Sequence, residues 1–527
     1  MSLIHRRAFG SRVLATAGSA WLAGQSSWGQ DPAAPGVIRS ETDRPAILDG
    51  VAAGDVGSDG VGVVWARTDR PSRMVVEWST TDSFRDARRV VGPAALPESG
   101  CAAKTVLTDL PLDQTIRYRV SFTDLSNPKA RSYPASGQFR TPGRDAADSR
   151  FCWGGDVAGQ GFGIDPSRGG MRIFESIRQT RPDFFLHSGD HVYSDNPILA
   201  EIKLDDGTLW RNLVTEGTSK VAETLNEFRD RFRYNRLDNA VRRFTAEVPI
   251  LAQWDDHETL NNWYPGEILD DPRYAVKAVD LLAARARQAF FESMPLRTHS
   301  ADPDRVYRQV RQGPRLELFL LDQRTYRGPN SPNRQPEDTE ATAFLGPDQL
   351  RWLTEGLKRS TATWKVIASD MPLGLVVRDG PKDYEALANG DPGAPLGRER
   401  ELARLLADLQ AARVRNIVWL TADVHYAAAH HYDPARARFT DFDPFWEFVA
   451  GPLHAGTFGP GTLDPTFGPE VRFNAIPVGT KPNRPPSDGL QFFGQVAVAG
   501  QTGVMTVSLH DRDGKSLYSV ELPPEVA

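Results

Sequence analysis

The chain has 527 residues, of which 40% are hydrophobic and 25% charged, and its formal net charge is -6 at pH 7. This length is too great for one small disulfide- or metal-stapled fold, and the apolar content excludes wholesale disorder. Because 62 basic residues stand against 68 acidic ones, the chain lacks the positive excess that binding to a phosphate backbone requires. The composition predicts a globular protein of about two to four domains, with no obligate nucleic-acid partner.

The first 30 residues are predicted to be a targeting segment. His5-Arg6-Arg7-Ala8-Phe9 precedes a mildly apolar stretch, residues 13–24, that is too short and too rich in Gly, Ala and Ser to span a bilayer. This pattern resembles a twin-arginine (Tat) signal peptide. It predicts export by the Tat machinery and a periplasmic or secreted location, with no transmembrane segment. A basic, disordered N-terminus is the alternative. Cys101 and Cys152 are too few for a disulfide framework, so we expect both to be free.

Residues 44–142 predict a small all-β sandwich. β-Branched and aromatic runs, separated by Pro, Gly, Asp and Asn turns, predict strands at 61–67, 74–78, 104–107 and 116–122. Residues 110–118 resemble the corner of fibronectin type III-like domains, in which a tyrosine, here Tyr118, closes the sheet edge. This region has no cluster of catalytic residue types, and we expect it to be a binding or packing module.

Residues 148–525 predict an α/β domain, because strand and helix patterns alternate along them. The predicted strands are 150–153, 183–187, 249–254, 316–321, 364–368, 416–420, 492–498, 504–509 and 516–520. The predicted helices are 171–179, 274–293, 347–360 and 397–413. Residues 195–245 and 370–395 are predicted to be long insertions over the edge of the sheet where such domains bind ligands, so we expect them to set substrate choice.

Four predicted strands end directly in residues of metal-binding type. These ends are Asp156, Asp190, Asp255-Asp256-His257 and Asp423-Val424-His425. A single aspartate in such a place is more often a turn or helix-capping residue. However, the carboxyl ends of parallel strands converge at one edge of a sheet, and converging carboxylates repel one another unless a cation lies between them. The four ends together therefore predict a metal cluster.

The same motifs, in the same order, resemble those of the metallophosphoesterase superfamily. More narrowly, residues 189–193, the block Trp254-Asp-Asp-His-Glu-Thr-Leu-Asn-Asn262, and residues 321–327 and 420–425 are similar to PhoD-type alkaline phosphatases. That family also carries a Tat signal and a fibronectin-like N-terminal domain, and the resemblance covers essentially residues 5 to 520. It implies a four-layer metallophosphoesterase-like α/β sandwich, preceded by the small β-sandwich, and a hydrolase of small phosphate esters.

The resemblance also implies a ferric ion (Fe3+) with calcium (Ca2+) as cofactors. Asp190 would bridge the two metals, and Tyr193 would give iron a phenolate ligand, although Tyr193 packing beneath the loop is the alternative. The remaining implied ligands complete the shell of the second metal: Asp256, Asn261, Asp423 and His425.

One position departs from the family pattern. The first strand ends in Gly154-Gly155-Asp156 where the family has Ala-Ser-Cys, so a carboxylate of Asp156 replaces the thiolate expected on iron. Cys152 is not a substitute, because four strand residues displace it by about 13 Å. Hard oxygen ligands suit Fe3+ and Ca2+ but also Mn2+ and Mg2+, so the metal identity stays open.

The implied chemistry is attack on phosphorus by a metal-activated water, which requires a proton or hydrogen-bond donor near the leaving oxygen. His257 is the candidate donor; its alternative role is to hydrogen-bond Asp190 from behind the metals. Arg398, which opens a predicted helix, is a candidate phosphate ligand, although arginines in such places are more often solvated.

These features predict an alkaline phosphatase acting on phosphate monoesters. A phosphodiesterase or phospholipase-type hydrolase using the same site is the first alternative. An inactive binding protein is the second, and the presence of every ligand position argues against it.

Overall fold

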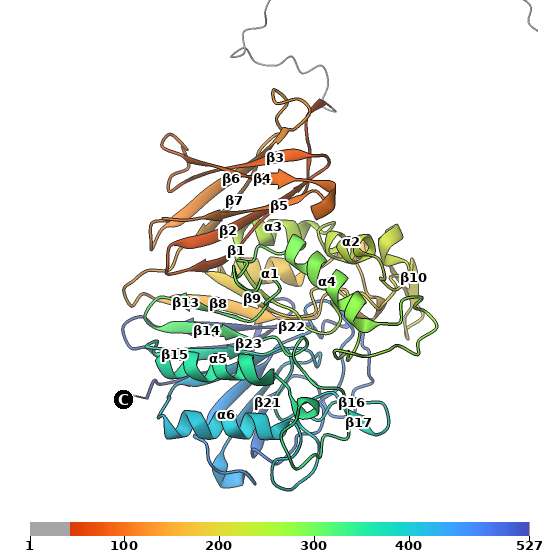
Figure 1. Ribbon diagram of the computed structural model, residues 1–527, viewed down its shortest axis with the longest axis vertical. Helices are drawn as coiled ribbons and strands as arrows, with labels where there is room; N and C mark the ends of the chain where they lie inside the picture. Colours follow the sequence, from red (N-terminus) through yellow and green to blue (C-terminus); the bar gives the residue numbers. More distant parts are fainter. Residues whose placement is uncertain (1–42, 526–527) are drawn as a thin grey trace, which may run out of the picture. The chain divides into compact units, whose positions relative to one another are not determined.

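The computed structural model of the chain describes residues 43–525 (Figure 1). The Tat-like segment, residues 1–30, lies outside this range. The described residues form three large sheets and two small hairpins. The hairpins are β10 (Glu201–Lys203) with β11 (Leu209–Arg211), and β16 (Arg378–Asp379) with β17 (Asp383–Tyr384).

The three large sheets contain the predicted strands and several more. The nine-stranded sheet has the order β24 (Ser516–Leu522), β23 (Met505–Asp511), β22 (Phe492–Val498), β8 (Ser149–Gly154), β9 (Phe184–Ser188), β12 (Ile250–Gln253), β1 (Ile47–Gly57), β2 (Val61–Thr68), β5 (Ala102–Leu107). The seven-stranded sheet has the order β13 (Arg308–Gln312), β14 (Leu316–Leu320), β15 (Trp364–Ala368), β18 (Ile417–Thr421), β20 (Phe445–Val449), β19 (Ala428–Tyr432), β21 (Pro469–Asn474). The four-stranded sheet has the order β4 (Arg88–Ala95), β3 (Ser72–Ser79), β6 (Thr115–Asp124), β7 (Ala135–Arg140).

Alternating side chains on the strands build the layers. On β9, Phe184 and Leu186 lie in the apolar core shared by the nine- and seven-stranded sheets, whereas Phe185 lies in a core with α1 (Ile173–Gln179) and α3 (Asn239–Glu247). On β14, Leu318 faces the shared core and Phe319 faces α5 (Gly346–Arg359) and α6 (Glu399–Ala411). Both faces of these strands are buried, which explains their continuous apolar runs. The result is a helix–sheet–sheet–helix sandwich.

The N-terminal all-β region is joined to the α/β region through a shared sheet. β1 pairs in parallel with β12, with Gly54 opposite Ile250, so β1, β2 and β5 extend the nine-stranded sheet. Pattern reasoning missed β1 because Ile47-Leu-Asp-Gly-Val-Ala-Ala-Gly-Asp-Val-Gly57 is rich in Gly, Ala and Asp. The expectation for Tyr118 is wrong: β6 is an inner strand of the four-stranded sheet, and no hydrogen-bond partner for the buried hydroxyl occurs among residues 43–525.

The predicted insertion at 195–245 includes α2 (Leu225–Asn235) and most of α3, two helices that pattern reasoning missed. The sequence does carry a start signal, because Thr224 and Glu227 form a capping box at the first turn of α2. The side chain of Asp238 caps α3 by accepting the backbone N–H groups of Ala240 and Val241. Helix α4 (Val279–Ser293) begins five residues later than expected from the pattern at 274–293.

The four strand ends come from two sheets, which corrects the expectation of one shared sheet edge. β8, β9 and β12 belong to the nine-stranded sheet, and β18 belongs to the seven-stranded sheet. Gln253, at the end of β12, ties the sheets together where they meet: its Nε2 donates to the carbonyl oxygens of Leu321 (3.0 Å) and Ala368 (2.8 Å). Within residues 43–525 no helix has the length and apolarity needed to cross a membrane.

Candidate metal centre

The residues after the strand ends turn sharply so that their side chains meet. Asp156 follows β8 and Asp190 follows β9, with φ of 69° and 48°; Asp423 and His425 follow β18, with φ of 64° and 60°. All four lie in the left-handed region, which aspartate tolerates better than most residues. These backbone turns direct side chains from two different sheets into one place.

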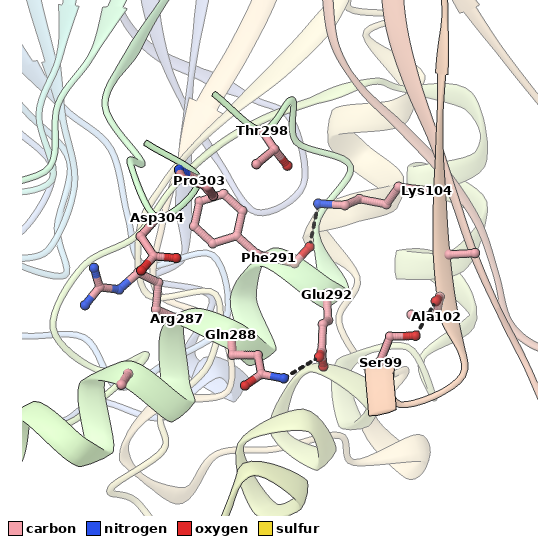
Figure 2. Close-up of a pocket in the computed structure, with 12 residues that line it drawn as sticks. Ser99, Ala102, Lys104, Arg287, Gln288, Phe291, Glu292, Thr298, Pro303 and Asp304 are labelled. Atoms are coloured by element: carbon pink, nitrogen blue, oxygen red, sulfur yellow. Dashed lines mark hydrogen bonds between the residues drawn. The ribbon is translucent and has the colours of Figure 1, made fainter. Parts of the chain in front are cut away.

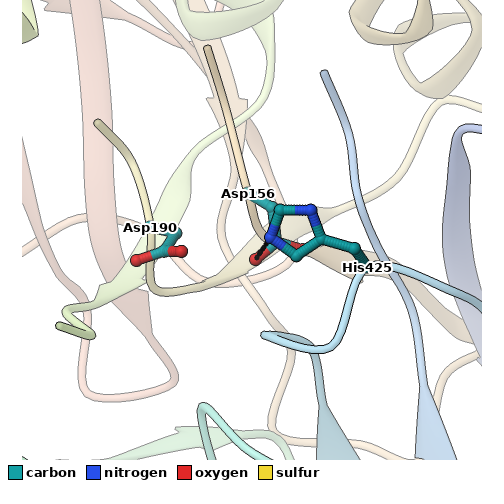
Figure 3. Close-up of side chains that lie close together, drawn as sticks. All are labelled: Asp156, Asp190 and His425. Carbon is teal, nitrogen blue, oxygen red and sulfur yellow. Dashed lines mark ion pairs between the residues drawn. The ribbon is translucent and has the colours of Figure 1, made fainter. Parts of the chain in front are cut away.

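Three overlapping groups of side chains lie close enough to hold metal ions. In each group the ligand atoms are within 4.8 Å of one another. Figure 3 shows the first group, in which the ring of His425 faces the carboxylate of Asp156, with Asp190 beside them. The groups are Asp156, Asp190 and His425; Asp190, Asp256 and His257; and Asp255, Asp256 and Asp423. Asp190 and Asp256 each belong to two groups, so the three form one continuous site.

The carboxylate oxygens of this site fit a metal. Both oxygens of Asp156 and the Oδ1 of Asp256 are buried, with no hydrogen-bond partner in the described part of the chain. Each unsatisfied buried polar group costs about 1–3 kcal/mol. Burial, reinforced by the neighbouring acids Asp256 and Glu258, raises the pKa of Asp156 and Asp190 well above the usual range, although His257 opposes the shift. A bound cation would satisfy the unpaired oxygens and stabilise the buried carboxylates in their charged form. An oxygen-rich set of ligands with one or two imidazoles suits hard metal ions.

His425 and Tyr193 add a nitrogen and an oxygen donor to the first group. His425 Nδ1 donates to the Gly456 carbonyl oxygen in a short contact, which leaves Nε2 as the free ring nitrogen. The hydroxyl of Tyr193 donates to this Nε2 over 2.7 Å. The structure therefore groups His425 with Asp156, Asp190 and Tyr193, and not with Asp256 and Asp423, where the family resemblance placed it.

His257 is held in one orientation by Asp195. The Nδ1 of His257 donates to Asp195 Oδ1 over 2.7 Å, and Asp195 Oδ2 accepts the Asn261 backbone N–H over 3.1 Å. The other nitrogen, Nε2, is thereby left for the metal groups. Burial lowers the pKa of His257, but the carboxylates of Asp195, Asp256 and Asp190 more than offset it, so the net pKa lies well above 6.5. Sequence reasoning missed Asp195; its signal was a further acid only five residues after Asp190.

The two remaining predicted site residues lie differently. The side chain of Asn261 is exposed, and only its backbone contacts the site. The assignment of Arg398 to substrate is corrected. Arg398 is 1% exposed, and its guanidinium donates to backbone carbonyl oxygens of two loops, including those of Glu385 (2.6 Å) and Gly328 (3.0 Å). Its Nη1 and Nη2 bind the two loops together, and the buried side chain is not open to a phosphate.

Two further acids and an arginine near the site were also missed. Glu258 joins two strand ends, since its carboxylate accepts the backbone N–H groups of Asp255 (2.7 Å) and His191 (2.5 Å). Arg324 and Asp370 lie behind the third group and are fully buried. Arg324 belongs to the motif at 321–327, so the sequence marked the segment without indicating the role. Cys101 and Cys152 are both free, as expected.

The burial of His187, on β9, leads us to expect that the free energy of unfolding falls in acid. Its ring stacks on His191 at 3.5 Å, and burial lowers its pKa from 6.5 to about 3. Below pH 6.5 His187 is protonated in the unfolded chain but stays neutral in the folded chain. The free energy of unfolding should therefore fall by about 1.4 kcal/mol per pH unit until about pH 3. In His187→Gln that contribution should vanish. Urea unfolding of both metal-free proteins from pH 7 to 4 checks this; equally steep pH dependence in the two would refute it.

A separate hollow of about 510 Å³ lies between β5 and α4 (Figure 2). Three of its polar side chains are already hydrogen-bonded or paired within the protein. Lys104 donates to the Phe291 carbonyl oxygen (2.7 Å), and burial lowers its pKa to about 8. Gln288 donates to Glu292 (2.9 Å), which also pairs with Arg229 (2.6 Å). We therefore assign the chemistry to the metal groups and not to this hollow.

Comparison with known proteins identifies relatives with this combination of regions. The family model of the PhoD-like phosphatases matches residues 151–509, and that of the PhoD-like phosphatase N-terminal domain matches residues 31–143. Alkaline phosphatase D of Bacillus subtilis (strain 168) is 27% identical over 434 residues, which are 78% of this chain and 70% of that protein.

Solved structures share the fold. A structure of PhoD superimposes with a TM-score of 0.66 at 19% identity, over 91% of this chain and 92% of that one. The purple acid phosphatase PPD1 from yellow lupin (Lupinus luteus) seeds gives a TM-score of 0.57 at 11% identity, over 91% of this chain and 74% of that one. The α/β sandwich is thus of the metallophosphoesterase type. Because the family model covers more than half of its length, this chain belongs to the PhoD-like phosphatase family of hydrolases.

Proposed function

We propose that the protein is an exported, metal-dependent phosphatase that hydrolyses phosphate monoesters by attack of a metal-activated water. The observation that carries this proposal is the set of three overlapping ligand groups, whose buried carboxylate oxygens lack partners among the described residues. The family match supports phosphate-ester chemistry at this place. The Tat-like residues Arg6 and Arg7 support export.

The proposed ligands of the first ion are Asp156, Asp190, Tyr193 and His425, and those of the second are Asp190, Asp256 and Asp423; Asn261, whose side chain is exposed, is left out of the set. Asp190 is the proposed bridge because it belongs to two groups. The bound ions would neutralise phosphate oxygens and lower the pKa of a water molecule. We propose Fe3+ at the first position, because phenolate and carboxylate oxygens suit a ferric ion, and Ca2+ at the second, with Mn2+ or Mg2+ as the alternatives.

His257 is proposed to give a proton to the leaving oxygen. His257 lies in one group with Asp190 and Asp256, and its Nδ1 is fixed by Asp195, which leaves Nε2 to donate. A carboxylate on one ring nitrogen holds the imidazole in orientation and favours the protonated, donating form.

A leaving-group comparison tests the role of His257. In His257→Asn we expect kcat to fall about 100-fold on an alkyl phosphate, as is typical for loss of a general acid, but much less on a nitrophenyl phosphate, whose leaving group needs no proton. Asp195→Asn should show the same pattern more weakly. Steady-state kinetics with both substrates, on protein whose metal content equals that of wild type, measure the effect. An equal loss on both substrates would contradict proton donation.

The test of the proposed function is hydrolysis by the purified, signal-free protein of an aryl phosphate monoester, a diester and a phospholipid, before and after chelation. We expect the highest kcat/KM on the monoester. The activity should disappear on chelation and return when metal is restored. Equal rates in the metal-loaded and metal-free forms would refute metal dependence, and a preference for either of the other substrates would refute the monoester assignment.

A further inference from the structure

Arg324 lies at the back of the metal centre as a fully buried cation. It follows β14 in the segment 321–327, and its side chain is 0% exposed. A buried guanidinium is costly unless it is paired and hydrogen-bonded. The carboxylates within ion-pair distance of it are those of Asp255, Asp370, Glu385 and Asp423.

The backbone beneath Arg324 is fixed by a local turn. Asp322 Oδ1 accepts the backbone N–H groups of Arg324 (3.1 Å) and Thr325 (3.0 Å). The Asp322 N–H in turn donates to Gln349 of α5 over 2.8 Å. Asp322 therefore anchors the residue to a helix, and the guanidinium is presented from a rigid support.

Arg324 holds Asp255, and Asp255 holds Asp256. The Nε of Arg324 donates to Asp255 Oδ1 over 2.7 Å, and Nη2 lies 2.5 Å from the same oxygen. This oxygen also accepts the backbone N–H of Asp256 over 2.8 Å. The Oδ2 of Asp256 accepts the Asn262 N–H (2.6 Å), which leaves its Oδ1 as the oxygen without a partner. The hydrogen bonds thus run from Arg324 to a proposed metal ligand.

On its other side Arg324 reaches the insertion at 370–395. Its Nη1 donates to Glu385 in a short contact, and its Nη2 lies 3.9 Å from Asp423 Oδ1. A planar guanidinium can serve Asp255 and Glu385 at once, whereas a lysine ammonium is a point charge on a flexible stem. One side chain therefore links the insertion to two of the strand ends that carry the ligands.

We propose that Arg324 is a positioning residue, which acts through Asp255 to aim the carboxylate of Asp256 at the metal pair. The inference rests on the proposed metal site. A positioning role can be distinguished from a purely electrostatic one. Removing a positive charge from among carboxylates would by itself tighten the binding of a metal cation, whereas loss of positioning would weaken that binding.

Calcium binding to metal-depleted protein tests the proposal, using isothermal titration with Ca2+ and metal content by elemental analysis. In Arg324→Met we expect Ca2+ affinity to fall about 10- to 100-fold, the range seen when residues supporting metal ligands are removed. Arg324→Lys keeps the positive charge but lacks the planar guanidinium, and its Ca2+ affinity should fall nearly as far. The Ca2+ affinity of Asp255→Asn should match that of Arg324→Met. The double variant should bind Ca2+ no more weakly than either single variant, because Arg324 is proposed to act through Asp255.

Arg327 offers a matched control, because it is a buried arginine of the same segment that approaches Glu385 but, among the described residues, makes no hydrogen bond or ion pair with Asp255. Arg327→Met should change Ca2+ affinity less than about threefold, even where it lowers the melting temperature. Unchanged or tighter Ca2+ binding in folded Arg324→Met, or wild-type affinity in Arg324→Lys, would overturn the proposal. If Arg324→Met does not fold, Arg324→Lys and Asp255→Asn decide. Wild-type protein that binds no metal would instead overturn the proposed function.

Discussion

Asp190→Asn should reduce phosphatase activity to less than about a tenth of wild type, a loss at least as large as the roughly 10- to 100-fold loss typical of residues that only support metal ligands. Asp190 belongs to two of the three ligand groups, so its loss should separate the two ions as well as weaken each. Asparagine is the suitable replacement, because it tolerates the left-handed backbone found at this position (φ 48°). Initial rates on an aryl phosphate, together with metal content, measure the effect.

Asp183→Asn is the matched control for this variant. Asp183 precedes the same strand, β9, at its opposite end, where its carboxylate accepts the Arg150 N–H over 2.9 Å. We expect that variant to keep both its metals and its activity. Retention of more than about a tenth of wild-type activity by Asp190→Asn, with metal content unchanged, would rule out the bridging role of Asp190 and leave the other ligands in place.

Tyr193→Phe should remove the colour of the iron-containing protein. A phenolate bound to a ferric ion gives a charge-transfer band in the visible, and phenolate on Ca2+, Mn2+ or Mg2+ does not. Tyr193 is 2% exposed, and its hydroxyl lies 2.7 Å from His425 Nε2, within the first ligand group. The visible spectrum of the as-isolated protein and of the variant measures the band, with circular dichroism to confirm folding.

Tyr234→Phe provides the control for this prediction, because Tyr234 is equally buried and its hydroxyl donates to the Leu213 carbonyl oxygen (2.8 Å), outside the metal groups. That variant should stay coloured. A colourless, fully active wild-type protein without iron would contradict the iron assignment, and the hydrolase assignment would then stand on another metal.

The strands that carry the site could be predicted from sequence because their pattern has one physical cause. β8, β9, β12, β14, β15 and β18 are buried on both faces, so each is a continuous apolar run, and the polar residue that follows it is conspicuous. β1 lacked this signal because its many glycines and alanines do not form a run of large apolar side chains. The helices of the 195–245 insertion were missed because their apolar residues stand among many charged and amide side chains, although α2 begins with a capping box.

The sequence predicted that the strand ends converge, but not that they come from two different sheets. A strand pattern does not say which sheet a strand joins, so β18 was expected beside β8, β9 and β12, whereas it approaches from the opposing sheet. The same limit affects single side chains. Arg398 and Arg324 are both arginines in loops, and only the three-dimensional contacts show that one binds backbone carbonyls and the other binds Asp255.

The most direct test of the metal centre is a crystal structure of the as-isolated protein with anomalous diffraction recorded on both sides of the iron absorption edge. We expect one metal peak in contact with Asp156, Asp190 and His425, and a second in contact with Asp190 and Asp256. The first peak should respond to the iron edge. Active crystals with no metal peak in contact with Asp190, or with metal bound only elsewhere in the molecule, would contradict the proposed centre.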